Sequence, residues 1–134
     1  MKTIIVFALL LINLSAKSTY SGALTSYSNG KVVKSSEQFT NACEDGNMNA
    51  CYSLGILYYK GNGVDQDIPK ALDLLEQSCY GNELNGCMYL GYLYTYGQSV
   101  KKDIPKAKSL FYKACRQGSK MGCNALKSIS DKTY

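Results

Sequence analysis

The 134-residue sequence contains no histidine, no tryptophan and only two prolines. Without histidine, the chain cannot build a Ser-His-Asp or Cys-His catalytic arrangement, and it offers no imidazole ligand for zinc. It also has no Gly-rich phosphate-binding loop and no basic stripe with interleaved aromatic residues of the kind that binds nucleic acid. We therefore expect no cofactor, no bound metal ion and no nucleic-acid partner.

The N-terminal residues 1–16 have the pattern of a secretory signal peptide. Lys2 supplies a positive charge, the segment 4–12 is apolar but too short to span a bilayer, and small residues allow cleavage after Ala16. The alternative interpretation is a buried N-terminal helix. No later apolar run approaches spanning length, so we expect no stable membrane insertion after cleavage.

Residues 17–34 are rich in Ser, Gly and Tyr and lack a helical period, which predicts a polar arm or linker.

The formal charge is +5 and drops to +4 once Lys2 is removed with the signal peptide. The lysines are scattered along the chain. They predict either a solvated basic surface or a weak attraction to anionic envelope polymers.

Six cysteines form three Cys-x7-Cys pairs, and successive pairs lie 36 residues apart: Cys43 and Cys51, Cys79 and Cys87, Cys115 and Cys123. An even count in an exported chain favours disulfides, and the repeat favours the three local pairs among the possible connectivities. Zinc and redox sites are the alternatives, but both typically use the closer Cys-x2-Cys spacing. We interpret the pairs as structural disulfides.

The segments 43–78 and 79–114 are identical at 15 of 36 positions without a gap, as in a solenoid of repeats. Apolar residues at helical spacing predict a first helix at 47–60 and 83–96 and a second helix at 68–80 and 104–116. Asp67 and Asp103, each followed by Ile-Pro, are expected to cap the second helix. Gly61 and Gly97 are expected to end the first.

The predicted repeat domain covers residues 35–130, with units at about 47–80 and 83–116, half-units at 35–46 and 119–130, and a tail at 131–134. Gly55 and Gly91 recur at one repeat position and are expected to allow close helix packing. Ser99 stands where the turn pattern expects Gly and is expected to carry a small backbone strain.

The segments 50–64 (ACYSLGILYYKGNGV) and 67–71 (DIPKA) resemble the Sel1-like repeat, a relative of the tetratricopeptide repeat. The 36-residue period with one Cys-x7-Cys pair per unit is similar to the Helicobacter cysteine-rich proteins, and the likeness covers about residues 36–127. It implies an all-α, right-handed superhelix of αα-hairpins stapled by disulfides, in the periplasm or outside the cell. It also implies binding of penicillin or peptidoglycan-like ligands with slow β-lactam hydrolysis, whereas other members of the wider family are adaptors.

No catalytic residue is identified from the sequence. The Ser-x-x-Lys spacing of serine β-lactamases and penicillin-binding proteins occurs at Ser28–Lys31 and Ser99–Lys102, but in the polar arm and in a turn, without companion motifs. Most tyrosines of the first helices are expected to pack in the core, and a minority to face a ligand. The candidate ligand-facing residues are Tyr52, Tyr59, Met88, Tyr92 and Tyr96.

Two functions are compatible with these features. One is binding of a β-lactam or a peptidoglycan fragment, with slow hydrolysis at most. The other is a secreted or periplasmic, non-catalytic adaptor that binds an envelope or host protein or peptide. In both cases we expect a monomer.

Overall fold

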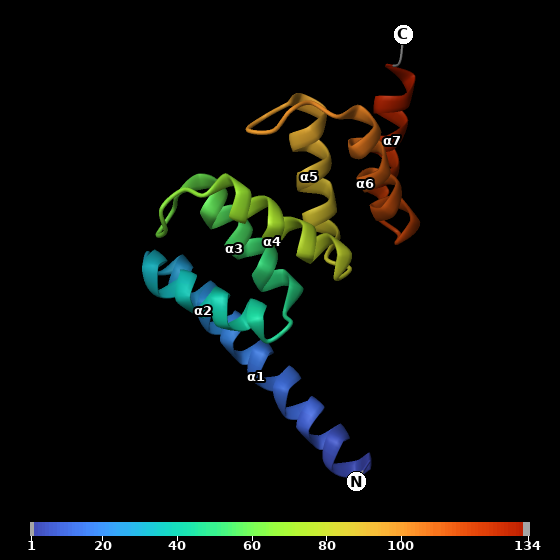
Figure 1. The fold of residues 1–134 in the computed structure, drawn as a ribbon. Coiled ribbons are helices and arrows are strands. Elements are labelled where there is room, and N and C mark those ends of the chain that lie inside the picture. The colour runs from blue at the N-terminus through green and yellow to red at the C-terminus, as the bar shows by residue number, and fades with distance from the viewer. Residues whose placement is uncertain (1, 133–134) are drawn as a thin grey trace. The chain divides into compact units, whose positions relative to one another are not determined.

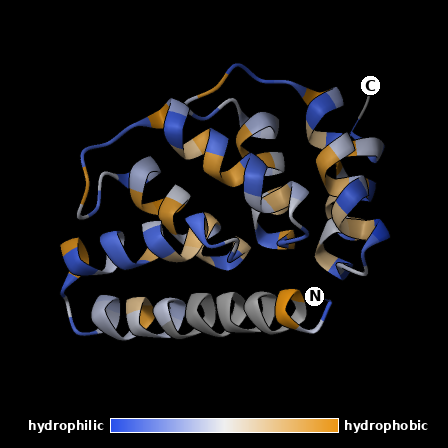
Figure 2. Ribbon diagram, turned by 60° about the horizontal axis from the view of Figure 1, so that its bottom comes forward, coloured by the Kyte–Doolittle hydropathy of each residue, from blue (hydrophilic) through white to orange (hydrophobic). Residues whose placement is uncertain are grey.

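The computed structural model describes residues 2–132, and for residues 6–18 it describes the backbone alone. The described residues contain seven α-helices and no β-strand: α1 (Lys2–Ser28), α2 (Val32–Glu44), α3 (Met48–Lys60), α4 (Ile68–Tyr80), α5 (Leu84–Tyr96), α6 (Ile104–Arg116) and α7 (Lys120–Asp131) (Figure 1). The four helices predicted for the two full units are confirmed as α3 to α6, each to within one residue. Figure 2 shows hydrophobic and hydrophilic residues interspersed along the helices. Helices α4 and α6 are amphipathic and bury one face, whereas α3 and α5 are apolar on most sides, as expected of helices packed between neighbours.

The predicted all-α fold of αα-hairpins stapled by disulfides is confirmed. The chain forms two compact units, residues 1–74 and 75–134, whose boundary falls within α4. Two parts of the N-terminal and C-terminal predictions lie outside the described residues: the side chains around the expected cleavage after Ala16, and residues 133–134 of the tail. Among the described residues, no helix combines the length and the apolar character needed to cross a membrane.

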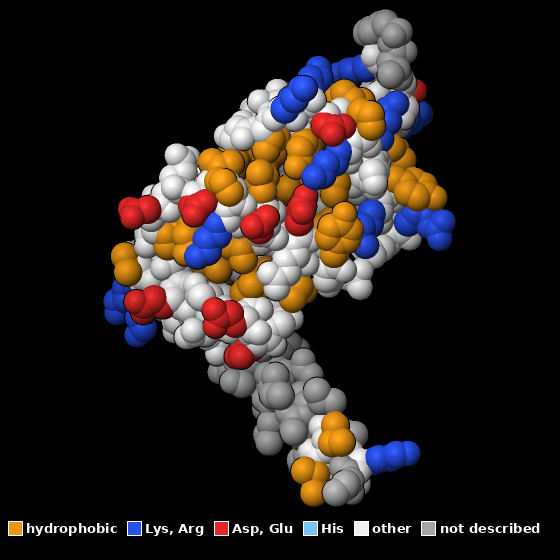
Figure 3. All heavy atoms as spheres, in the orientation of Figure 1, with side chains coloured by type: hydrophobic (Ala, Val, Ile, Leu, Met, Phe, Trp, Pro, Cys, Tyr) orange, Lys and Arg blue, Asp and Glu red, His pale blue; other side chains and the backbone are white. Residues whose placement is uncertain are grey.

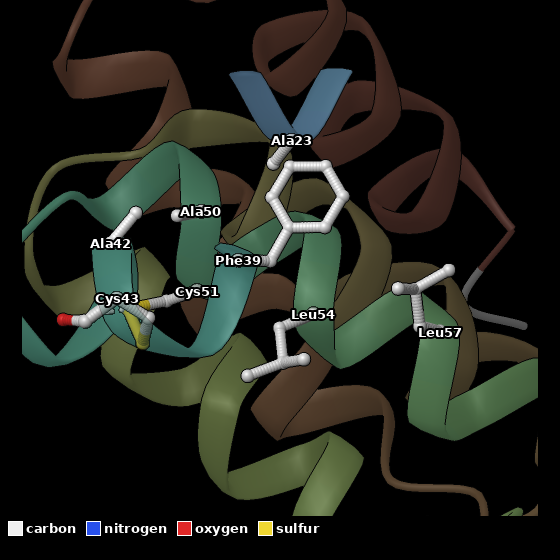
Figure 4. Close-up of a cluster of buried hydrophobic side chains, with 8 residues drawn as sticks. All are labelled: Ala23, Phe39, Ala42, Cys43, Ala50, Cys51, Leu54 and Leu57. Carbon is white, nitrogen blue, oxygen red and sulfur yellow. Dashed lines mark hydrogen bonds between the residues drawn. A yellow bond between two sulfur atoms is a disulfide. The ribbon is translucent and has the colours of Figure 1, made fainter. Parts of the chain in front are cut away.

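The first unit has a core built from α1, α2 and α3. Phe39 of α2 lies at its centre, with Ala23 of α1 beside the ring and Leu54 and Leu57 of α3 on the other side (Figure 4). Ala23 is fully buried, and Phe39 is 2% exposed. Burial of a large apolar side chain contributes about 1.5–3 kcal/mol, so this contact holds α1 firmly on α2.

The prediction of a polar arm or linker at 17–34 is therefore wrong. Residues up to Ser28 are helical, α2 already begins at Val32, and the Tyr20 and Phe39 rings lie 5.8 Å apart. The connection from α1 to α2 is four residues shorter than the one from α3 to α4. Ala23 lies five residues before the end of α1, as Gly55 and Gly91 lie five residues before the ends of α3 and α5. The shift of four residues is about one helical turn, so Ala23 points the same way as the two glycines. Residues 19–28 thus supply the missing first helix of an additional repeat.

The helix ends follow the predicted caps. The Asp67 carboxylate accepts a hydrogen bond from the Lys70 backbone N–H at 3.0 Å, and Asp103 accepts from Lys106 N–H at 2.9 Å. Gly61 and Gly97 end α3 and α5 in the left-handed conformation, with φ of 64° and 66°. These caps fix where each hairpin turns, and they are typically worth about 1 kcal/mol each.

Glycines let the helices approach closely. A Cβ at Gly91 would lie 2.5 Å from Cε1 of Phe111 in α6, which confirms the predicted close packing at this position. Gly55 is buried at the equivalent position of α3. The sequence analysis did not single out Gly86 and Gly122, each just before a cysteine; a Cβ there would lie 2.9 Å from Leu75 O and 2.8 Å from Ala114 Cβ respectively.

Three disulfides join each second helix to the next first helix, as predicted: Cys43–Cys51, Cys79–Cys87 and Cys115–Cys123. Their Cα atoms lie 4.7, 4.6 and 4.5 Å apart, within the usual range for a disulfide. The turns between them pass through left-handed residues at one repeat position, Gly46, Asn82 and Gly118. Closing such a short loop stabilises by roughly 2.5 kcal/mol per bridge in the chain-entropy model.

Candidate functional site

The candidate site is a groove of about 580 Å³ in the second unit, between α5, the start of α6, and α7. That volume is in the range of ligand-binding clefts. Its walls combine aromatic, aliphatic and polar side chains: Tyr92, Thr95, Tyr96, Lys102, Ile104, Phe111, Met121, Asn124, Ala125, Ser128, Ile129 and Lys132.

The repeat explains why these residues meet. Tyr92 and Ser128 occupy one repeat position, 36 residues apart, and Tyr96 and Lys132 occupy another. In each helix the two positions are four residues apart and so lie on one face. The same face of α5 and of α7 is therefore turned toward the groove, and the side chains at these positions decide its chemistry.

The groove has an aromatic wall and an apolar floor. Tyr92 packs edge-on against Phe111, with ring centroids 5.2 Å apart, and stacks on Tyr96 at 6.4 Å. Phe111 and Ile129 are only 1% and 8% exposed, whereas Tyr92 and Tyr96 are 39% and 67% exposed. The Tyr92 ring, held by its buried neighbour, and the Tyr96 ring stacked on it present aromatic surface to solvent that can bury a partner's apolar side chain.

The rim of the groove is polar and basic. Lys102 precedes α6 and Lys132 follows α7, and both side chains are exposed. Asn124 and Ser128 on α7 add neutral hydrogen-bonding groups. The Thr95 hydroxyl is already engaged, because it donates to the Gly91 carbonyl at 2.7 Å.

A smaller groove, of about 200 Å³, lies in the first unit between α1 and α3. It is lined by apolar residues and one serine: Leu24, Tyr27, Phe39, Tyr52, Ser53, Ile56 and Leu57. No charged side chain takes part. The second unit therefore offers the larger site with the more varied chemistry.

The five predicted ligand-facing residues do not share one site in the structure. Tyr92 and Tyr96 line the larger groove, and Tyr52 lines the smaller one. Met88 is 7% exposed and belongs to the core of the second unit. Tyr59 is half-buried and lines neither groove, and its carbonyl accepts a hydrogen bond from Gln66 Nε2 at 2.8 Å.

Sequence reasoning missed the groove residues of α7 and the two rim lysines. Met121 is 65% exposed although it is apolar, and Asn124 is equivalent to the buried Met88. The repeat register could have found them, because α7 positions are those of α5 shifted by 36 residues. The repeat register did not indicate Lys102, because the equivalent residue of the preceding unit, Gln66, is not a lysine.

A lysine–tyrosine contact recurs in both units. Lys70 Nζ donates to the Tyr58 hydroxyl at 2.8 Å, and Lys106 Nζ donates to the Tyr94 hydroxyl at 2.9 Å. Each ammonium group also lies over the ring of its tyrosine, at 4.2 and 4.4 Å from the centroid. These contacts tie the first turn of the second helix to the preceding helix, which is a structural role.

The second of these contacts also includes a carboxylate, since Lys106 Nζ forms an ion pair with Glu76 Oε1 at 2.9 Å. Hydrogen bonds to Tyr94 and to Glu76 hold the pKa of Lys106 above its ordinary value. A lysine with a raised pKa stays protonated, so this group is unsuited to act as a base.

The two Ser-x-x-Lys matches do not form a nucleophile site. The Ser28 hydroxyl donates to the Thr25 carbonyl at 2.9 Å at the exposed end of α1. Ser99 lies in the turn before α6 with a φ of 58°. This left-handed conformation is the one that the prediction of backbone strain at Ser99 requires. Within residues 2–132, the described side chains form no group of three or more potential metal ligands.

Comparison with known proteins agrees with this architecture. The family model described as Sel1 repeat matches residues 49–83 and 84–119. Comparison with the curated proteins gave no match.

Several solved structures share the fold. One is cysteine-rich protein B of Helicobacter pylori, at 31% identity and a TM-score of 0.68, covering 84% of this chain and 86% of that one. A protective antigen of uropathogenic Escherichia coli that displays an SLR fold has 25% identity and a TM-score of 0.75, covering 85% of this chain and 25% of that one. A Sel1 repeat protein from Oxalobacter formigenes has 20% identity and a TM-score of 0.77, covering 87% and 50%.

The chain thus spans a quarter and a half of the length of the Escherichia and Oxalobacter proteins. The matched repeats, the period of 36 residues and the disulfide in each hairpin junction lead to one assignment. The chain belongs to the Sel1 repeat family, as a cysteine-rich member stapled by disulfides.

Proposed function

We propose that this protein is a non-catalytic binding scaffold whose larger groove holds a peptide segment of a partner protein. The observation that carries the proposal is a pair of solvent-exposed rings in a groove of about 580 Å³: Tyr92, which packs on the buried Phe111, and Tyr96, which stacks on Tyr92. Exposed aromatic side chains held in one orientation are typical of binding surfaces and carry much of their energy.

The chemistry of the groove favours binding over catalysis. Its lining contains no carboxylate, no cysteine and no histidine, and its two lysines are exposed on the rim. A catalytic lysine or serine requires a neighbouring group that changes its pKa or takes its proton. The resemblance to the Helicobacter cysteine-rich proteins implies a β-lactam or peptidoglycan ligand. The side chains that line the groove form no arrangement that supports this expectation.

We place the scaffold in the periplasm or outside the cell. Its six cysteines are all paired in disulfides, and such bonds persist in oxidising compartments and are rare in the cytosol. Detection of the protein in culture medium, periplasmic and cytosolic fractions tests the location, and a purely cytosolic protein with free thiols would contradict it.

The function is tested by panning a random-peptide display library against the oxidised protein and against its Tyr92→Ala/Tyr96→Ala variant. The matched control is Tyr80→Ala/Tyr112→Ala, because these tyrosines are 67% and 52% exposed and lie outside the groove. We expect peptides that bind the wild type and the control but not the groove variant. No enrichment, or equal binding to all three proteins, would refute the scaffold proposal.

A second arm uses labelled penicillin and nitrocefin. We expect neither stable labelling nor ring opening by the oxidised protein. Turnover above that of the Tyr92→Ala/Tyr96→Ala variant would favour the β-lactam function in place of the scaffold.

A further inference from the structure

We infer that the larger groove selects an acidic peptide segment that also carries an apolar or aromatic side chain. This inference rests on the proposed function and adds the chemistry of the partner.

The charge of the chain is unevenly divided. Residues 1–74 contain six basic and six acidic residues, and residues 75–134 contain nine basic and four acidic residues. The whole formal charge of +5 is therefore carried by the second unit, which also holds the larger groove. In Figure 3 basic side chains are frequent over α6 and α7, whereas acidic ones are frequent over α2 to α4. A positive surface around a cleft attracts an anionic partner and raises its rate of association.

Among the described residues of the second unit, the side-chain carboxylates are engaged elsewhere or lie outside the groove lining. Glu76 is paired with Lys106, and Glu83 and Asp103 accept backbone hydrogen bonds as the N-caps of α5 and α6. Asp131 is exposed but does not line the groove. Among the described residues, neither Lys102 nor Lys132 forms an ion pair, so both ammonium groups are available to carboxylates of a ligand.

The apolar part of the groove indicates a peptide rather than a simple polyanion. Besides the two lysines, the lining includes the exposed rings of Tyr92 and Tyr96 and the exposed side chain of Met121. Contacts with these groups stabilise a complex only if the ligand brings apolar surface of its own, at about 25 cal/mol per Å² buried. A peptide that carries both an apolar residue and Asp or Glu can contact the aromatic wall and the basic rim together.

Three fluorescein-labelled synthetic peptides test this inference by fluorescence anisotropy with the oxidised protein. The first is Ser-Glu-Glu-Phe-Glu-Glu-Ser; the second has Gln in place of each Glu; the third has Ala in place of Phe. We expect the first peptide to bind about three- to ten-fold more tightly than the second, the effect that two exposed ion pairs support, and the preference to shrink as salt is raised. The third peptide should bind more weakly than the first.

Protein variants locate the charge effect. Lys102→Glu/Lys132→Glu should abolish or reverse the preference for the acidic peptide and leave binding of the Gln peptide unchanged. The matched control is Lys101→Glu/Lys127→Glu, which makes the same charge change in the same loop and on α7, the helix that Lys132 follows, but outside the groove lining. It should keep most of the preference.

Each contrary outcome has a distinct meaning. Equal affinity for the Glu and Gln peptides would overturn the acidic selectivity while leaving the scaffold proposal intact. Equal affinity for the Phe and Ala peptides, or equal effects of the two lysine variants, would show unselective attraction of polyanions and would also overturn the inference. If none of the three peptides binds, the inference fails, and the display library separately decides whether the groove binds other peptides.

Discussion

The Gly91→Ala substitution tests the close contact between α5 and α6 in the second unit. The added Cβ would lie 2.5, 2.8 and 2.9 Å from three ring carbons of Phe111, whereas carbon atoms in contact prefer separations of about 3.5–4.0 Å. The ring would have to move by about 1 Å. It has little room to do so, because it is 1% exposed and its edge already contacts Tyr92.

Two effects of opposite sign determine the size of the change. Replacing a helical glycine by alanine adds about 1 kcal/mol of helix propensity, and overpacking a core costs about 1–3 kcal/mol. We therefore expect a net loss of up to about 2 kcal/mol in the free energy of unfolding. In thermal unfolding of the oxidised protein followed by circular dichroism, that loss lowers Tm by roughly 4 °C for each kcal/mol.

Gly22→Ala in α1 is the matched control. The Cβ there would meet only the end of the flexible Gln38 side chain, with Nε2 at 3.3 Å, so the gain in propensity should prevail and the protein should be as stable as the wild type or more so. Phe111→Leu should relieve part of the cost of Gly91→Ala, so the double variant should be more stable than the two single effects predict. A Gly91→Ala protein more stable than the wild type, or strict additivity with Phe111→Leu, would refute the packing argument.

Three further predictions concern the disulfides, the strained turn and the recurrent lysine. Replacing Cys79 and Cys87 together by Ser should cost roughly 2.5 kcal/mol in urea unfolding, and no loss would contradict the role of the bond as a stabilising staple. Ser99→Gly should raise the unfolding free energy by up to about 1 kcal/mol, because φ is 58° at this residue; a lower Tm than the wild type would contradict it. Glu76→Gln should lower the pKa of Lys106 toward its ordinary value, which NMR titration measures, and an unchanged pKa would rule out the ion pair as a cause. The stabilisation linked to that raised pKa is present below the ordinary lysine pKa and is lost as pH rises through the folded value, so this variant should lose less stability in alkali than the wild type.

The regular part of the fold could be predicted because its signals are local and repeated. The cysteine spacing, the Asp-Ile-Pro starts and the glycine ends each recur after 36 residues, so one unit supports the interpretation of the next. The same reliance on the period explains the error at residues 17–34. Their helix keeps the repeat geometry but joins α2 through a connection four residues shorter, which removes it from the register.

The candidate site could be predicted only in part, since exposure depends on neighbours that the sequence does not reveal. Met88 and Tyr92 are one helical turn apart on α5, yet Met88 is 7% and Tyr92 is 39% exposed. Lys132 occupies the repeat position of the predicted Tyr96, but only the packing of α7 places it at the groove. Aromatic content thus indicated a binding surface, while packing decided which of its members a ligand can reach.

The position of the disulfides determines how the protein responds to a protease. Every bond closes a junction between a second helix and the next first helix, and none crosses the loops at 61–67 and 97–103. Lys60, Lys101 and Lys102 place trypsin sites at or in these loops. A single cut there leaves fragments that no covalent bond connects, so nicked material should separate on a denaturing gel even without a reducing agent. The disulfides therefore stabilise the junctions against thermal unfolding, whereas a protease can separate the chain at the loops that no disulfide closes.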